Sequence, residues 1–184
     1  MTRSFADAVE HLLGIEGGLV DHPADPGGIT NYGISLRFAR GVTDLNANGH
    51  PLLDVDGDGD VDADDIRKLS KEDAAEVYRI YFWGACKCDQ MPWPIAFMVF
   101  DASVNHGRGP AIEMLQRSVK TEPDGKIGPM TLNAVQRRSN SMRELLNEYG
   151  ARRGLRYATT KNFDSFGLGW MRRLFGVHCI ALAG

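Results

Sequence analysis

The segment IAFMVFDASV, residues 95–104, is apolar on nearly every side. A helix with this pattern has no polar face to turn toward water, so it has to lie at the centre of a domain with other elements packed around it. Apolar residues elsewhere recur at the three- and four-residue spacing of helices, and no long segment alternates as a half-buried strand does. These patterns predict a mostly α fold, a helical bundle around a central buried helix.

The surrounding helices are predicted from their apolar faces and their start signals. Ser70 is followed three residues later by Asp73, which is the pattern of a capping box at the start of a helix. Proline is favoured in the first turn of a helix, and two prolines stand in front of apolar stripes. The expected helices start near residue 5 and at Ser70, Pro110, Pro129, 141 and 163.

The first of these helices leads into a candidate catalytic residue. Phe5, Val9 and Leu12 share one helical face, and Glu16, about three turns after Phe5, falls on the same face. Gly17-Gly18 then ends the helix. Burial and the negative end of the helix dipole both favour the protonated carboxyl, so Glu16 has the environment of a general acid near neutral pH.

A turn-rich segment, DPGGIT at residues 25–30, follows that helix and predicts a fold-back of the chain. The return can bring Asp25 and Thr30 over Glu16, with Asp21 as a rival to Asp25. A protonated carboxyl facing an ionised one is the apparatus of glycoside hydrolysis. The next residues, ITNYGISL at 29–36, favour a small hairpin or an extended wing.

An acidic segment, DVDGDGDVDADD at residues 54–65, matches the calcium loop of EF-hands. Calcium prefers about six to eight oxygen ligands, and alternate residues of a tight loop point inward. We expect Ca²⁺ here in a structural role, and a solvated acidic loop is the alternative. The candidate ligands are Asp54, Asp56, Asp58, Asp60, Asp62 and Asp65.

The chain resembles a known family of enzymes. EGGLVDHPADPGGITNYGIS, at 16–35, looks like the opening of the endolysins and muramidases of glycoside hydrolase family 108. AFMVFDASVNHGRGPAIEMLQ, DGKIGPMTLNAV and NFDSFGLGWMRR are similar to the second half of those enzymes, described as a predicted peptidoglycan domain. Residues 43–69 lie outside the resemblance, and their acidic loop resembles those of dockerins.

The resemblance implies a lysozyme-like α+β fold with a small β wing. We expect one catalytic domain over 1–184, an inserted calcium loop at 43–69, and a helical part at 101–184 that resembles the peptidoglycan domain. The implied enzyme is a phage endolysin, an antimicrobial muramidase that hydrolyses the β-1,4 bond between N-acetylmuramic acid and N-acetylglucosamine. The expected catalytic residues are Glu16, Asp25 and Thr30. Asn31, Tyr32 and Asn105 are expected to line the sugar cleft, since Tyr and Asn offer flat apolar surface and hydrogen bonds.

Two other functions remain open at this stage. A lytic transglycosylase uses one acid and no water, so it would tolerate loss of Asp25 and leave anhydro-muramic ends. A non-catalytic, calcium-dependent wall-binding module would bind sacculi without clearing them.

Bulk properties limit the partners. A net charge of −3 gives no nucleic-acid footprint, and no apolar run reaches the roughly 18 residues of a membrane span. The sequence starts without the pattern of a signal peptide, so we expect a monomer made in the bacterial cytoplasm that reaches the wall after the membrane is breached. Cys86, Cys88, His178 and Cys179 offer zinc-ligating atoms, but Cys-x-Cys is not the usual spacing, and we favour free structural thiols.

Overall fold

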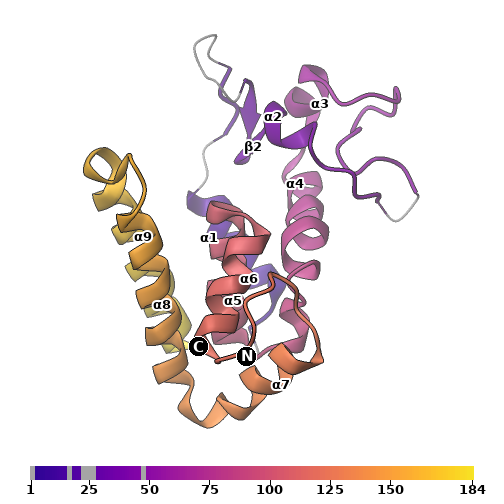
Figure 1. The fold of residues 1–184 in the computed structure, drawn as a ribbon. Helices are drawn as coiled ribbons and strands as arrows, with labels where there is room; N and C mark the ends of the chain where they lie inside the picture. Colours follow the sequence, from indigo (N-terminus) through magenta and orange to yellow (C-terminus); the bar gives the residue numbers. More distant parts are fainter. Residues whose placement is uncertain (1–2, 16–17, 22–27, 47–48) are drawn as a thin grey trace. The chain divides into compact units, whose positions relative to one another are not determined.

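The computed structural model describes residues 3–15, 18–21, 28–46 and 49–184 (Figure 1). The chain divides into two compact units. We call Phe5–Phe82 the N-terminal unit, and Trp83–Gly184 together with Met1–Ser4 the C-terminal unit. Each unit is described by itself below.

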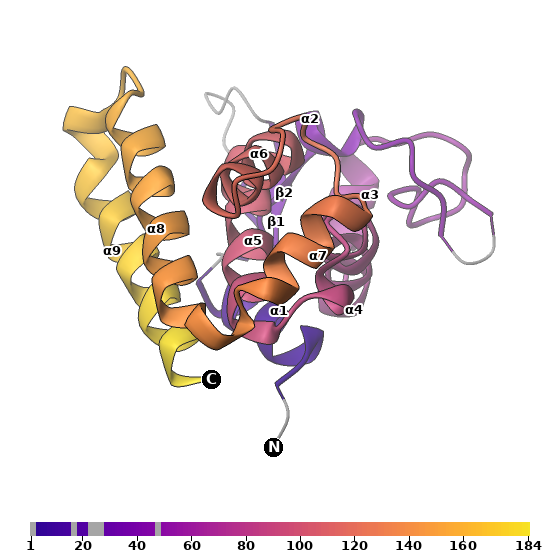
Figure 2. The same ribbon diagram turned by 60° about the horizontal axis from the view of Figure 1, so that its bottom comes forward.

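The C-terminal unit is a helical bundle built around α5, Trp93–His106. This helix contacts α6, α8 and α9, and every residue from Ile95 to Ser103 is buried (Figure 2). The prediction of a central buried helix is therefore confirmed. The remaining elements of this unit are a 3₁₀ turn at Cys88–Gln90, α6 at Arg108–Ser118, α7 at Pro129–Arg137, a 3₁₀ turn at Ser139–Ser141, α8 at Met142–Ala158 and α9 at Phe163–Ala183.

Gly107 separates α5 from α6 and has a φ of 87°. This left-handed conformation is costly for residues with a side chain, so glycine is the residue that allows one helix to end and the next to begin at once. Pro110 lies in the first turn of α6 and Pro129 begins α7, as their sequence positions predicted.

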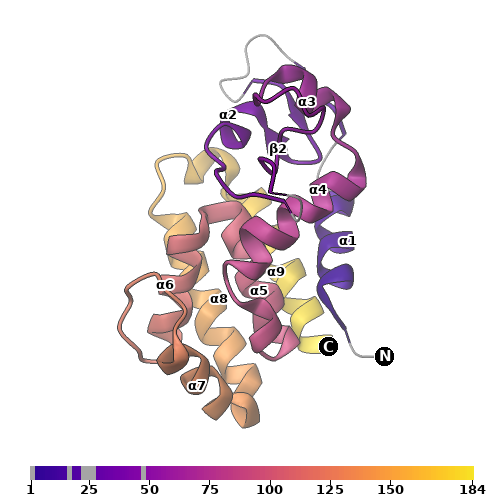
Figure 3. The ribbon, with the colours of Figure 1, turned by 90° about the vertical axis from the view of Figure 1, so that its right-hand side faces the viewer.

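The N-terminal unit contains short elements. They are α1 at Phe5–Ile15, β1 at Thr30–Asn31, β2 at Ile34–Ser35, α2 at Leu36–Ala39, α3 at Ala63–Lys68 and α4 at Lys71–Val77, followed by a π-helical segment at Tyr78–Gly84. Figure 3 shows α2 and α3 close to the hairpin strand β2. The capping box predicted for Ser70 and Asp73 is present at the start of α4.

Aromatic side chains hold α2 against the π-helical segment. The Phe38 ring stacks on Phe82 with 5.6 Å between centroids and meets the edge of Tyr81 at 5.1 Å. Such pairs add about 0.5–1.5 kcal/mol each beyond the apolar area that they bury. They hold α2, which directly follows the hairpin strand β2, in place.

The predicted fold class is confirmed, because the described part is mostly helical with one small antiparallel sheet. Within that part, no helix combines the length and the apolar character that crossing a bilayer requires.

Candidate active site and acidic loop

The chain folds back on itself between Val20 and Thr30, as the turn-rich segment predicted. The two residues form an antiparallel bridge in which each backbone N–H donates to the other's carbonyl oxygen at 2.8 Å. Thr30 then enters β1 and pairs with Ser35 of β2. This bridge fixes the backbone of Thr30, while its hydroxyl donates a long 3.4 Å hydrogen bond to the Gly28 carbonyl oxygen.

The hairpin predicted at 29–36 is present and turns at Tyr32-Gly33. Asn31 pairs with Ile34, and both turn residues have positive φ, 47° and 78°. Two left-handed residues are the signature of the type I′ turns that suit the twist of two-residue hairpins. A non-glycine residue in this region is uncommon, and the Tyr78 hydroxyl supports it by donating to the Tyr32 carbonyl oxygen at 2.9 Å.

Asn31, a predicted sugar contact, is 6% exposed. Its side-chain amide donates to the carbonyl oxygens of Ile66 and Leu69 at 3.0 and 3.1 Å. Those carbonyls lie at the end of α3, where helical partners are missing, so Asn31 ties the hairpin to the helix that follows the acidic loop. Substrate binding by Asn31 stays a prediction beside this structural role.

Glu16 and Asp25, the predicted acid and its carboxylate partner, lie outside the described residues. Asp21, the rival of Asp25, is described and forms an ion pair with Arg67 at 3.0 Å. Both side chains are about half exposed, and Arg67 also pairs with Asp64 at 2.7 Å. Asp21 is therefore already engaged with a cation.

Asn105, the remaining predicted sugar contact, belongs to the C-terminal unit and lies near the end of α5. Its Oδ1 accepts a hydrogen bond from the Tyr157 hydroxyl at 2.5 Å. Tyr157 in turn accepts from the Arg153 guanidinium at 3.0 Å. Because arginine can only donate, the Tyr157 proton is directed to Asn105, and the Asn105 side-chain NH₂ is left as a donor.

This hydrogen-bond chain ends in a buried ionic cluster that the sequence analysis missed. Asp101 and Arg153 are 1% and 0% exposed, and their nearest oxygen and nitrogen are 2.5 Å apart. Arg173 pairs with the other Asp101 oxygen at 2.9 Å. Burial disfavours ionisation of Asp101, but attraction to Arg153 and Arg173 outweighs it and lowers its pKa. The sequence did contain a signal for this cluster, because Asp101 is a carboxylate within the otherwise apolar segment 95–104.

His106, next to Asn105, is held neutral. Burial, assisted by repulsion from Arg153 and Arg156, lowers its pKa to about 3. The geometry agrees, since Arg153 Nε donates to His106 Nε2 at 3.4 Å and this nitrogen must accept.

Two glycines shape the turns of the acidic loop at residues 54–65. Gly57 and Gly59 have φ values of 76° and 100°. Asp65 is 1% exposed, and its two oxygens accept from the backbone N–H groups of Val55 and Asp62 at 2.7 and 2.8 Å. This carboxylate ties the start of the loop to its end.

Asp65 belongs to two clusters of three aspartates. In each cluster, one carboxylate oxygen from every aspartate lies within 4.8 Å of the other two. The first contains Asp54 and Asp56, the second Asp60 and Asp62, and Asp58 belongs to neither. Repulsion, mainly from Asp58, raises the pKa of Asp60, which is the unfavourable charge density that a cation relieves. All-oxygen donors fit Ca²⁺, so the loop offers ligands that match this ion.

Two family models match consecutive parts of the chain. The family model "Glycosyl hydrolase 108" matches residues 9–107, and "Predicted Peptidoglycan domain" matches 110–175. A solved structure, Brucella abortus SagA, is 32% identical with a TM-score of 0.79, over 97% of this chain and 94% of that one. No curated protein matches the chain.

The chain therefore belongs to glycosyl hydrolase family 108, as the sequence resemblance predicted. It is a glycoside hydrolase that degrades peptidoglycan.

Proposed function

We propose that this enzyme is a muramidase that hydrolyses the β-1,4 bond between N-acetylmuramic acid and N-acetylglucosamine, with Glu16 as the general acid. The observation that carries the proposal is the family match over 9–107, which spans Glu16 and the described Val20–Thr30 fold-back. A carboxyl at the end of an apolar helical face suits proton donation to the leaving oxygen.

Asp25, helped by Thr30, orients or activates the attacking water or stabilises the oxocarbenium-like charge. The ion pair of Asp21 with Arg67 favours Asp25 over its rival, because the Asp21 carboxylate already has a partner other than the attacking water. Tyr32, Asn31 and Asn105 contact the glycan, Asn105 through the NH₂ group that Tyr157 leaves free to donate.

The wider setting of the enzyme is proposed on the same basis. The chain works as one lysozyme-like enzyme, with residues 43–69 as a calcium-loop insert and 101–184 as the part that engages the wall. It acts as a monomeric phage endolysin, made in the host cytoplasm and released to the wall when the inner membrane is breached.

Product analysis tests the reaction. Digestion of purified sacculi is expected to release muropeptides with reducing N-acetylmuramic acid ends, detected by mass spectrometry after borohydride reduction. Anhydro-muramic ends would indicate a lytic transglycosylase, and reducing N-acetylglucosamine ends would indicate cleavage of the other glycosidic bond. Bound protein without soluble products would support a wall-binding module instead.

We also propose that residues 54–65 bind Ca²⁺ as a structural ion. The proposal is supported by the two oxygen clusters around Asp65 and by the glycine turns between them. Among the six candidate ligands, all of which the structure describes, Asp56 is the one with an ion pair to a described residue: its Oδ2 lies 2.7 Å from Lys68 Nζ. One exposed ammonium balances little of the charge of six aspartates, so a divalent ion has a clear electrostatic advantage.

Calcium is expected to raise the melting temperature of the enzyme by roughly 5–10 °C when its concentration is about a hundred times Kd. The variant Asp54→Asn/Asp58→Asn keeps the oxygens that accept from Gly57 and Asp60 but removes two charges, so it should lose most of this rise. Glu10→Gln/Glu76→Gln removes the same charge from exposed positions of the same unit outside the loop and should keep this rise. Calorimetry with calcium or a chelator measures the effect, and equal responses of both variants would refute the site.

A further inference from the structure

Charge is divided unequally between the two units. The N-terminal unit contains 16 Asp and Glu against 6 Lys and Arg, whereas the C-terminal unit contains 8 against 15, giving net charges of −10 and +7. The overall charge of −3 conceals this contrast. A basic unit in an enzyme that acts on an anionic polymer has charge complementarity to its substrate.

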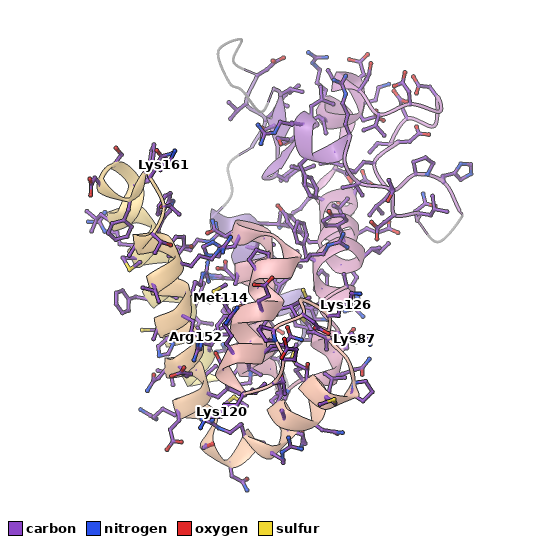
Figure 4. The ribbon with its side chains drawn as sticks, in the orientation of Figure 1. Lys87, Met114, Lys120, Lys126, Arg152 and Lys161 are labelled. Carbon is purple, nitrogen blue, oxygen red and sulfur yellow. The ribbon has the colours of Figure 1, made fainter. Side chains whose placement is uncertain are left out.

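Part of this positive charge lines a cleft between α6 and α8. The cleft measures about 320 Å³, and Figure 4 labels Met114 on α6 and Arg152 on α8 at this place. Its cations are Arg117 from α6 with Arg152 and Arg156 from α8. The other lining residues are Pro110, Glu113, Met114, Leu155 and Thr159.

The polar groups of this cleft have unused binding capacity. Arg117 and Arg156 are exposed and form no ion pair with any described residue. Arg152 pairs with Glu148, but its Nε–H is buried and, within the described part of the chain, has no hydrogen-bond partner. A buried donor without an acceptor is unfavourable, and a bound carboxylate would satisfy it.

Apolar side chains line the cleft as well. Leu155, in the last turn of α8, is 67% exposed, and Met114 and Pro110 line the same cleft. Glu113 adds one negative charge. The cleft therefore combines guanidinium groups, one carboxylate and a small apolar surface.

We propose that the α6–α8 cleft binds the peptide stem of peptidoglycan. The stem carries free carboxylates on its D-glutamate and terminal D-alanine, an amine on its third residue, and alanine methyl groups. Arg117, Arg152 and Arg156 take the carboxylates, Glu113 takes the amine, and Leu155 with Met114 covers the methyl groups. Neither a nucleic-acid duplex nor a phospholipid surface combines carboxylates, an amine and small methyl groups in this way.

The proposal deepens the proposed function, on which it rests for the nature of the substrate. All eight lining residues lie within 110–175, the segment matched by the predicted peptidoglycan domain. The cleft would hold the enzyme on the wall through the peptides while the N-terminal unit acts on the glycan.

The test uses the full chain with Glu16→Gln, so that binding is measured whether or not Glu16 is catalytic. The probe is N-acetyl-L-Ala-γ-D-Glu-meso-diaminopimelate-D-Ala, titrated by NMR at low and physiological salt. Replacing two exposed guanidiniums, Arg117→Gln/Arg156→Gln, is expected to weaken binding about five- to tenfold. Amidation of the peptide carboxylates should weaken its binding to the protein with all three cleft arginines to a similar extent.

Matched controls separate recognition from general attraction. Arg137→Gln/Arg143→Gln removes two exposed cations of the same unit outside the cleft and should change binding by less than about twofold. Glu113→Gln should weaken binding of the free amine but not of its acetylated form. Equal losses in both arginine variants, absence of saturable binding, or binding to anionic phospholipid vesicles but not to the peptide would overturn the proposal. Failure of the wild-type chain to cleave sacculi, with peptide binding intact, would count against the proposed reaction alone.

Discussion

Glu16→Gln is expected to lower the rate of peptidoglycan hydrolysis by about 10²- to 10⁴-fold, the contribution typical of a general acid. Glutamine keeps the size and polarity of the side chain but has no proton to donate to the leaving oxygen. Release of soluble muropeptides from purified sacculi measures the rate, and turbidity loss of permeabilised Gram-negative cells gives an independent readout.

Glu10→Gln is the matched control, because Glu10 is an exposed glutamate of α1, six residues before Glu16 in the sequence. It should retain full activity, and both variants should melt at the wild-type temperature. Clearing of cells by Glu16→Gln at the wild-type rate would remove Glu16 from the mechanism.

The same assay separates the two candidate aspartates. Asp25→Asn is expected to lose about 10²-fold or more if Asp25 acts on water, whereas Asp21→Asn breaks only an exposed ion pair and should stay within a few-fold. Full activity of Asp25→Asn together with anhydro products would support the transglycosylase reaction. A large loss of activity in Asp21→Asn with little loss in Asp25→Asn would assign the role of acting on water to Asp21.

Local sequence signals predicted the helices and the acidic loop well. The capping box of Ser70 and Asp73 involves residues three apart, and the loop turns join residues two or three apart, as in Gly57 to Asp54. Such contacts are specified by the type of nearby residues and by glycine at positive φ, so they can be read along the chain.

Side-chain roles that depend on packing were not predictable in this way. Asn31 resembles a ligand-binding residue in its sequence context, but its amide bonds to carbonyls 35 and 38 residues away. The arginines of the α6–α8 cleft come from two helices that are far apart in the sequence. They line a common cleft because the two helices pack against each other. Periodicity indicates which face of a helix is buried, but it does not say which polar group on another helix that face meets.

Asp101→Asn is expected to lower the free energy of unfolding of the C-terminal unit by about 3–5 kcal/mol, since it leaves Arg153 buried without its counter-ion. This loss is a large part of the 5–15 kcal/mol that stabilises a typical domain. The tryptophans Trp83, Trp93 and Trp170 all lie in this unit, so their fluorescence during urea unfolding reports on it.

The pH dependence of stability follows from two lowered pKa values. His106 stays neutral in the folded unit down to about pH 3, while in the unfolded chain it takes up a proton near pH 6.5, so stability falls as the pH drops through this range. Asp101 has a lowered pKa when folded, so its contribution is present above its ordinary value of 3.8 and is lost at more acid pH. His106→Gln should flatten the first part of this profile.

Two further variants identify the cause of the Asp101 effect. Glu122→Gln removes an exposed carboxylate from the same unit and should change the unfolding free energy by less than about 0.5 kcal/mol. Asp101→Leu/Arg153→Met replaces both buried charges by apolar groups and should recover much of the loss, because removing one member of a buried pair costs more than removing both. If the double variant were as unstable as Asp101→Asn, packing around α5 or the loss of the Arg173 partner, rather than the unpaired Arg153 charge, would explain the destabilisation.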